Sequence, residues 1–263
     1  MSIASLMRRA LHMPLEGNAP LARTPDDTVI YAIGDIHGRC DLLEKIQRSI
    51  SGHIRLYPAG RKVIVYLGDY LDRGINSRRV VDMVREWRPV DCSAAEIVTL
   101  KGNHEDLALR YLDGEIDAGR HWFDFDGLDG LDHYGVDSND RSARDDETMK
   151  IMRNRFAAAL PDEHLKFLLG LKTSHREGDY LFVHAGIRPG VALDEQSDSD
   201  MMWIRDLFLE SDNNHGVTVV HGHTIANKPQ IRHNRIGIDT GAYASGILTC
   251  LMLEGTERTF LHT

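Results

Sequence analysis

Residues 28–38 read TVIYAIGDIHG, an apolar, β-branched run that stops at a Gly-Asp-Ile-His-Gly cluster. The run is too short for an ordinary helix and is typical of a buried strand. The same pattern, a short apolar run that breaks into polar residues beside glycine, occurs four more times along the chain. The later runs end in GDYLDRG (68–74), GNHE (102–105), HAG (184–186) and HGHT (221–224).

The segments between these strands have helical periodicity. Apolar residues recur at helical spacing in Cys40–Ser51 and Ser77–Trp87, and helices are also expected at Glu105–Leu112 and Asp162–Leu171. Alternating strands and helices predict an α/β fold with helices on the faces of a sheet. Sites in such sheets lie outside the carboxyl ends of the strands, where all five polar clusters fall.

The alternative to a functional site is ordinary turn chemistry. One GDxHG sequence could be only a turn between a strand and a helix, and one histidine after a strand is more often a hydrogen-bonded core residue than a ligand. Turns have no need of histidine, however, and four of the five clusters contain it. The coincidence of five clusters therefore favours a functional site.

Together the clusters offer six metal-ligating side chains, which are oxygen or imidazole donors without a thiolate. Such donors suit Mn, Fe or Zn rather than soft metals or clusters. Six ligands that include a bridging carboxylate are enough for two ions, and paired ions clamp the attacking and leaving oxygens of a phosphoryl displacement. The predicted ligands are Asp35, His37, Asp69, Asn103, His184 and His223.

The five motifs, in this order, resemble those of the metallophosphoesterases. The most similar group is the phosphoprotein phosphatases, in particular their compact bacterial and phage serine/threonine phosphatases. The resemblance runs from about Val29 to the C-terminus. It implies the calcineurin-like fold, two β-sheets sandwiched between helices, with the site at one edge. Residues 29–263 would form the catalytic domain, and residues 1–28 an N-terminal extension.

The resemblance also implies roles for the metal ligands. Asp35 and His37 would hold the first metal, and Asp69 would bridge both ions. The shell would be completed by Asn103, which would also contact substrate, and by His184 and His223.

The same resemblance implies the catalytic groups. His104 corresponds to the proton donor to the leaving alkoxide, and Asp72 to the carboxylate that orients it. Arg73 and Arg205 would grip the phosphoryl oxygens and stabilise charge in the transition state. For Arg205 the alternative is a surface salt bridge with Asp206.

Two residues keep alternative interpretations. His221 aligns less well than His223 and is expected to support the metal site from outside the ligand shell, or to be structural. Tyr243 lies either at the mouth of the site, where it would bind substrate, or in the packed core.

The implied function is that of a metal-dependent phosphomonoester hydrolase, a serine/threonine protein phosphatase. Hydroxide activated by a dinuclear centre would attack phosphorus in line. Two divalent ions are implied, Mn²⁺ in the first place with Fe or Zn as alternatives. The expected partner is a phosphoprotein or a small phosphoester.

Three other functions compete with this one. Dinucleoside-tetraphosphate hydrolases of the same superfamily tend to carry Gln where His37 stands and to lack the Asp72–Arg73 pair. A non-catalytic scaffold that only binds partners should have lost a ligand or the acid, and none is missing. A nucleic-acid phosphodiesterase fits poorly with a net charge of −9, because phosphate backbones require clustered cations.

Residues 120–147, here called the cap segment, are acidic and contain several glycines. Related bacterial chains carry a W…GG…L…YG pattern here, and this chain has Asp126 where the first of the paired glycines is expected. A long segment of this kind is either functional, shaping substrate choice, or a mobile solvated insertion. Its aromatic residues favour a substrate-shaping insertion: Trp122, Phe123, Phe125 and Tyr134.

Composition sets the remaining limits. The chain has 263 residues with 42% hydrophobic and 27% charged residues, as in an ordinary globular protein. Its three cysteines form no CxxC pair, which favours reduced thiols and a cytoplasmic location. No apolar run reaches the roughly 20 residues that span a bilayer, and SLMRRALHMPLEG near the N-terminus lacks the apolar core of a secretory signal. Neither nucleic acid nor membrane is expected as a partner.

Overall fold

Strand β1 (Thr28–Ile33) is the central strand of a five-stranded sheet, and all six of its residues are buried. It pairs in parallel with β2 (Arg61–Tyr66), which pairs in parallel with β3 (Glu96–Thr99). On its other side β9 (Thr249–Glu254) and β10 (Glu257–His262) continue the sheet in antiparallel orientation. The strand order is β10-β9-β1-β2-β3. The carboxyl ends of three parallel strands therefore meet at one edge of this sheet.

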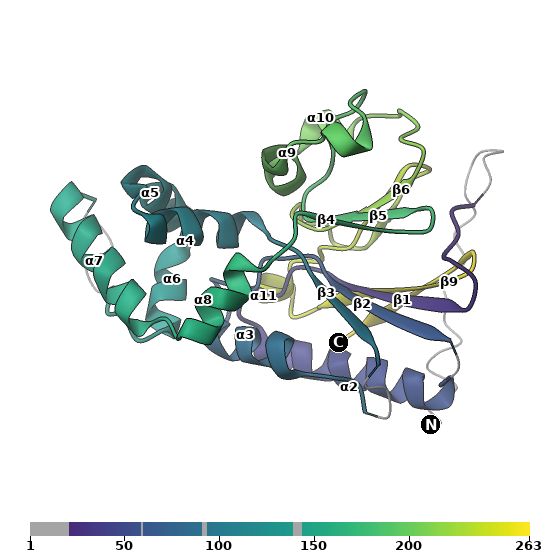
Figure 1. Cartoon of the computed structure of the whole chain (residues 1–263), viewed down its shortest axis with the longest axis horizontal. Coiled ribbons are helices and arrows are strands. Elements are labelled where there is room, and N and C mark those ends of the chain that lie inside the picture. The colour runs from purple at the N-terminus through teal and green to yellow at the C-terminus, as the bar shows by residue number, and fades with distance from the viewer. Residues whose placement is uncertain (1–20, 59, 91–93, 139–143) are drawn as a thin grey trace.

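The second sheet also has five strands, in the order β4-β5-β6-β8-β7. Its central strands β5 (Tyr180–Val183), β6 (Thr218–His221) and β8 (Arg235–Gly237) are parallel. Two antiparallel strands, β4 (Ser174–Glu177) and β7 (Gln230–Ile231), close its edges. The two sheets lie face to face (Figure 1).

Alternation of side chains along the strands builds three apolar layers. In β1, Ile30 and Ala32 belong to the cluster between the two sheets, whereas Val29, Tyr31 and Ile33 belong to the cluster beneath the helices. The outer face of the second sheet packs against a third cluster. This alternation is the period of two that a strand requires when both of its faces are buried.

Helices cover both outer faces, and Figure 1 shows three groups of them. Along the first sheet run α2 (Cys40–Leu56) and α3 (Ser77–Glu86), and the second sheet is covered by α9 (Asp198–Trp203) and α10 (Asp206–Leu209). A helical lobe at the end of the sheets contains α4 (Asn103–Asp113), α5 (Ile116–Asp124), α6 (Gly127–His133), α7 (Asp146–Ala159) and α8 (Asp162–Leu169). Shorter pieces are the 3₁₀ helix Leu193–Glu195 and α11 (Ala242–Ser245).

These elements belong to a computed structural model that describes residues 21–58, 60–90, 94–138 and 144–263. The α/β fold with two sheets among helices is confirmed. All five expected strands are present, as β1, β2, β3, β5 and β6, and all four expected helices are present as α2, α3, α4 and α8. The strands β9 and β10 were not expected, because no polar cluster follows either of them.

The cap segment is more ordered than its acidic composition suggests. Its described residues include the end of α5, all of α6 and the start of α7. Trp122 and Leu131 are fully buried in the main core cluster. The reason is that its apolar residues recur at spacings that place them on the inner faces of two short helices.

The N-terminal extension falls largely outside the described residues, which begin at Leu21. The part that is described contacts both sheets: Tyr180 Oη donates to Ala22 O, and Thr24 N donates to Gly255 O. Strand β1 begins at Thr28, one residue before the predicted start of the catalytic domain. Cys40 and Cys250 are free thiols. In the described part of the chain, no helix is long and apolar enough to cross a membrane.

Candidate active site

The polar clusters that follow the parallel strands converge at one edge of the two sheets. Asp69 forms one group of potential metal ligands with His37 and His104, and a second group with His184 and His223. Within each group the ligating atoms lie within 4.8 Å of one another, and all of these residues are buried. Two adjacent groups that share one carboxylate have the arrangement that a dinuclear centre requires.

The two oxygens of Asp69 face different histidines. Oδ2 lies 3.3 Å from His37 Nε2, and Oδ1 lies 3.5 Å from His184 Nε2. Burial alone would raise the pKa of Asp69, but the charges of His184, His104 and His37 outweigh it and bring that pKa well below its usual value. A carboxylate that stays ionised and divides its oxygens between two ligand groups is suited to bridging two cations.

The backbone fixes the orientation of two imidazoles. His37 Nδ1 lies 2.9 Å from Leu71 O, and His184 Nδ1 lies 2.9 Å from Leu67 O. A nitrogen that donates to a carbonyl leaves the other nitrogen, Nε2, as the one able to bind a metal. Both Nε2 atoms face Asp69.

Asn103 joins the second group. Its Oδ1 lies 3.0 Å from His184 Nε2 and 2.9 Å from His223 Nδ1. Asn103 begins α4, so its side chain lies at the positive end of a helix dipole beside the ligand set. The structure therefore brings Asn103 together with the two histidines that the sequence motifs group with it.

Asp35 lies beside these groups, although it belongs to neither. Its Oδ2 accepts from the backbone N–H of His223 at 2.9 Å. Burial raises the pKa of Asp35 well above its usual value, and the charges of Asp239 and Asp69 add to this effect. A cation beside such a carboxylate would favour its ionised form.

Two buried atoms of the proposed ligands have no hydrogen-bond partner, Asp35 Oδ1 and His223 Nε2. Buried polar atoms are nearly always paired, so each needs an explanation. A Cβ on Gly222 would lie 1.9 Å from Asp35 Oδ1, so only glycine allows this close approach. The unpaired atoms, the absence of thiolates among the ligands and the shared carboxylate all fit two divalent cations.

His104 and Asp72 form a buried pair next to the ligands. His104 Nδ1 lies 2.5 Å from Asp72 Oδ2, and His104 Nε2 lies 3.9 Å from Asp69 Oδ2. Burial lowers the pKa of His104 to about 3 and raises that of Asp72 well above its usual value. Burial thus opposes a standing imidazolium–carboxylate pair, and the negative charge of an arriving phosphoryl group would favour protonation of His104.

Trp122, from the cap segment, completes this pair. Its Nε1 donates to Asp72 Oδ2 at 2.7 Å, and the indole is fully buried. A Cβ on Gly130, also in the cap segment, would lie 2.1 Å from Asp72 Oδ1. The cap segment therefore determines the position of the carboxylate that orients His104.

Glu105 organises the turn that carries Asp69 and Asp72. Its carboxylate accepts from the backbone N–H groups of Asp69, Tyr70, Leu71 and Gly102 at 2.9 to 3.1 Å. Burial raises its pKa to about 8. All four of these contacts are to backbone N–H groups, so Glu105 acts by positioning the loop that carries Asp69.

Arg73 lies between three side chains at the rim. Its Nη1 is 3.0 Å from His37 Nε2, its guanidinium lies 4.5 Å above the ring of Tyr243, and its Nε donates to Asp126 Oδ2 at 3.2 Å. The Tyr243 ring is also 5.5 Å from the His37 ring, and Tyr243 is half-buried. The structure therefore places Tyr243 beside the ligand set and not in the packed core.

Arg205 lies at the start of α10, exposed and near the second group. Its positive charge contributes to lowering the pKa of His223, which burial chiefly brings to about 2. Among the described residues, no ion pair with Asp206 or any other carboxylate involves Arg205. The salt-bridge alternative for this arginine thus finds no contact to support it.

Aromatic side chains from two helices border the site. His121 stacks on Trp203 with ring centroids 5.5 Å apart, and Phe125 approaches Trp203 at 5.9 Å. Phe125 also lies 6.3 Å from the His104 ring, and Trp203 lies 6.4 Å from the His223 ring. The cap segment and α9 thus form an aromatic rim next to both the proton-donor candidate and a proposed metal ligand.

His221 lies apart from the ligand groups. Its Nδ1 is 3.0 Å from Gly222 O, its Nε2 is 3.4 Å from Arg235 Nη1, and its ring packs on Phe208. These contacts are those of a packed structural residue. His223, two residues later, enters the second group.

Sequence reasoning did not predict the contacts that four residues make at the site. Glu105 occupies the third position of α4, where a glutamate often bonds back to the helix start, and this signal was readable. Asp239 follows β8 as the other polar residues follow their strands, so its position near the site could also have been predicted from the sequence. The contacts of Trp122 and Asp126 depend on how α5 and α6 fold back on the Asp72 turn. No local sequence pattern predicts this packing.

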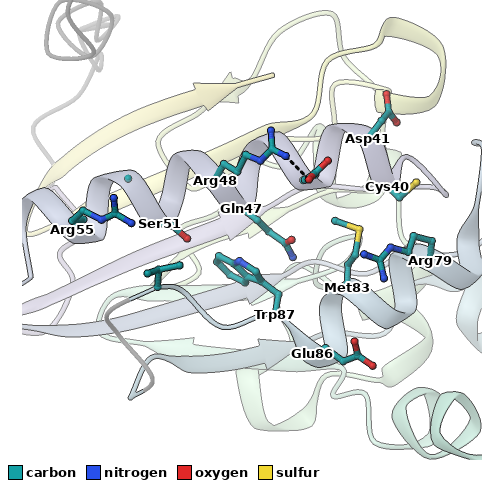
Figure 2. A pocket seen from close by; sticks show the side chains of 13 residues that line it. Cys40, Asp41, Gln47, Arg48, Ser51, Arg55, Arg79, Met83, Glu86 and Trp87 are labelled. Atoms are coloured by element: carbon teal, nitrogen blue, oxygen red, sulfur yellow. Dashed lines mark hydrogen bonds and ion pairs between the residues drawn. The ribbon is translucent and has the colours of Figure 1, made fainter.

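A separate cavity of about 830 Å³ runs along α2 and α3 (Figure 2). None of the six proposed metal ligands lines it. The positive and negative charges in its lining balance, so the cavity favours neither anionic nor cationic ligands. The charged residues are three arginines and three carboxylates: Arg48, Arg55, Arg79, Asp41, Glu44 and Glu86.

Comparison with known proteins agrees with this geometry. The sequence profile of the calcineurin-like phosphoesterases matches residues 28–240. The chain is 25% identical over 243 residues to bis(5'-nucleosyl)-tetraphosphatase PrpE [asymmetrical] of Anoxybacillus flavithermus, covering 86% of this chain and 90% of that protein. It is 26% identical over 235 residues to serine/threonine-protein phosphatase 2 of Salmonella typhimurium, covering 86% and 93%.

Solved structures share the fold. A candidate diadenosine tetraphosphatase superposes with a TM-score of 0.60 at 18% identity, covering 92% of this chain and 98% of that one. A point mutant of a cold-active protein tyrosine phosphatase superposes with a TM-score of 0.51 at 16% identity, covering 92% and 82%. At these identities the likeness concerns the fold alone.

Proposed function

The chain belongs to the calcineurin-like phosphoesterase family, and from this premise we propose that it is a phosphomonoesterase acting on phosphoproteins, of the serine/threonine type. The coarser activity, metal-dependent phosphoester hydrolysis, follows from the family and from the two buried ligand groups. The finer activity rests on one observation, the buried hydrogen bond of 2.5 Å between His104 and Asp72.

The leaving group decides whether such a pair is useful. A serine or threonine alkoxide is a poor leaving group and needs a proton as the P–O bond breaks. A nucleotide released from a polyphosphate chain leaves as a phosphate and needs little assistance. A buried imidazole oriented by Asp72, which Trp122 holds in turn, is therefore most valuable for an alkyl monoester.

The remaining groups would bind and orient the phosphoryl group. Arg73 and Arg205 supply two guanidinium groups on different sides of the ligand set, and Asn103 supplies an amide. Preorganised donors of this kind stabilise the charge that develops in the transition state. Two divalent ions held by the six ligands would supply activation of water and neutralise charge on the phosphoryl oxygens, and Mn²⁺ is our first choice for them.

The contact between Arg73 and Tyr243 supports a substrate-binding role for Tyr243. The ring holds the guanidinium from one face while leaving its Nη1 directed toward His37. A stacked guanidinium keeps its donors free for phosphoryl oxygens. The non-catalytic alternative predicts a lost ligand or acid, whereas this chain has all six proposed ligands and His104, and all seven are buried.

A dinucleoside-tetraphosphate hydrolase is the second candidate, because PrpE of A. flavithermus carries that activity in its name and covers 86% of this chain. A rate panel separates the two. The Mn²⁺-loaded protein should hydrolyse phosphoserine and phosphothreonine peptides with a higher kcat/KM than diadenosine tetraphosphate. A kcat/KM that is higher for the dinucleotide would overturn the phosphoprotein assignment, and phosphotyrosine peptides in the same panel would define the residue preference.

A further inference from the structure

Asp126 brings a negative charge to the rim of the phosphate site. Its Oδ2 accepts from Arg73 Nε at 3.2 Å, and its side chain is 58% exposed whereas that of Arg73 is 17% exposed. The carboxylate therefore sits on the solvent side of the guanidinium, and Arg73 Nη1 faces His37 on the other side.

The backbone of Asp126 is specialised as well. Its φ is +67°, in the left-handed region, and it precedes the first residue of α6. A residue there carries a conformational cost unless it is glycine, asparagine or aspartate. Among the described residues, seven other than glycine have positive φ, and six of them belong to this neighbourhood: His37, Asp69, Asp72, Arg73, Asp126 and His223.

The two arginines of the proposed phosphate site differ in whether a carboxylate is paired with them. Arg73 carries a resident carboxylate, whereas Arg205 has no ion pair within the described residues. Asp126 also directly follows Phe125, whose ring lies 6.3 Å from the ring of His104, the proton-donor candidate. A carboxylate here is therefore close enough to act on any charged group beside the scissile phosphate.

We propose that Asp126 is a specificity-determining residue, which orients Arg73 and selects phosphoester substrates with cationic groups beside the scissile phosphate over substrates with anionic groups there. A substrate with lysine or arginine next to the phosphorylated residue gains from this carboxylate. A substrate with glutamate there, or with further phosphates, is repelled by it. This inference rests on the proposed function, since it assumes that Arg73 binds the scissile phosphate.

Charge and geometry set the size of the effect. The interaction of two unit charges about 8 Å apart at the border of protein and water changes a binding constant by a factor of roughly three to ten. The effect should fall as salt rises, because the carboxylate is exposed. Removal of the charge should thus change the ratio of kcat/KM values between oppositely charged substrates. It should have a much smaller effect on kcat/KM for a substrate that lacks flanking charge.

The test uses two phosphoserine peptides that differ only in lysine or glutamate on both sides of the phosphorylated residue. Wild-type protein loaded with Mn²⁺ should prefer the lysine peptide, and Asp126→Asn should reduce the ratio of kcat/KM values by roughly ten- to hundredfold, because the gain for lysine and the loss for glutamate multiply. Asparagine keeps the left-handed backbone and removes the charge. Asp124→Asn is the matched control: Asp124 is exposed, two residues away, and has no contact with Arg73 among the described hydrogen bonds and ion pairs.

Two outcomes would overturn the inference. The first is an unchanged ratio in Asp126→Asn, and the second is an equal change in Asp124→Asn. Binding of the same peptides with a non-hydrolysable phosphonate in place of phosphate, measured by calorimetry, reports the preference even without turnover. If wild type binds the lysine phosphonate peptide better and Asp126→Asn does not, but neither phosphate peptide is hydrolysed, the proposed function fails and the role of Asp126 stands.

Discussion

Replacement of His104 by asparagine tests the proposed chemistry most directly. The asparagine amide falls near the position of the imidazole Nδ1, so it can still donate to Asp72, which lies 2.5 Å from Nδ1 in the parent. Nothing in the variant replaces Nε2, the nitrogen that faces Asp69. The change therefore removes the proton donor, while the buried Asp72 carboxylate keeps a hydrogen-bond donor.

The expected loss depends on the leaving group. A positioned general acid contributes about two to four decades in rate, so kcat for a phosphoserine peptide should fall by that amount, equivalent to about 3 to 5 kcal/mol. An aryl phosphate leaves without much protonation, and its kcat should fall by less than about tenfold. The KM for both substrates should change little, because His104 would act only as the bond breaks.

The assay is steady-state kinetics on a phosphoserine peptide and an aryl phosphate, with the Mn²⁺ content of each protein measured. His233→Asn is the matched control, because His233 is exposed in the turn between β7 and β8 and contacts Asp212 O. The control should keep both rates. An equal loss on the alkyl and aryl substrates would refute the reasoning and would indicate that His104 binds phosphate or metal instead.

Four further predictions follow from the site. Exhaustive chelation should abolish aryl-phosphate hydrolysis and Mn²⁺ should restore it, whereas full activity in protein shown by elemental analysis to be metal-free would contradict a metal-dependent site. Arg205→Ala should raise the inhibition constant for inorganic phosphate by about tenfold, in line with the loss of one charge-assisted contact; an unchanged constant would return Arg205 to a surface role. Single-turnover hydrolysis in ¹⁸O-labelled water should place the label in phosphate, and acid quench should trap no phosphoprotein, because the chain has no Cys-x5-Arg motif and both Asp35 and Asp69 belong to the proposed ligand set. Trp122→Phe, which removes the donor to Asp72, should lower kcat for alkyl more than for aryl phosphates, and a purely structural role would lower both equally.

The convergence of the polar clusters could be predicted from the sequence for a physical reason. Each proposed ligand follows a strand closely, as Asp35 follows β1 and His184 follows β5, and parallel strands deliver their carboxyl ends to one edge. Five local patterns therefore specify one place in the fold. The spatial choice between His221 and His223 also had a local basis, because His221 ends β6 whereas His223 lies beyond the glycine that follows it.

The cap segment shows where local patterns fail. Its sequence left a solvated insertion and a packed, substrate-shaping segment as alternatives; in the structure Trp122 is fully buried and lies against Asp72, 50 positions earlier in the chain. The contact depends on two short helices and on Gly130, which leaves no room for a side chain against Asp72. A hydrogen bond between distant segments leaves no periodic signal in either of them.

Under the proposed function, this arrangement would join substrate choice to leaving-group chemistry. The cap segment presents Phe125 to the ring of His104 and Asp126 to Arg73, and the same segment positions Asp72 through Trp122. Substitutions at its exposed positions should change which substrates are preferred while the chemistry stays intact.

Substitutions at its buried positions should act differently, because a side chain on Gly130 would meet Asp72 Oδ1 at 2.1 Å and displace the carboxylate that orients His104. A cap that was free to diverge in sequence for new substrates would therefore have to keep its inner face constant. Asp126 stands at the boundary between these two faces, since its carboxylate is exposed while its left-handed backbone starts the helix that carries Gly130.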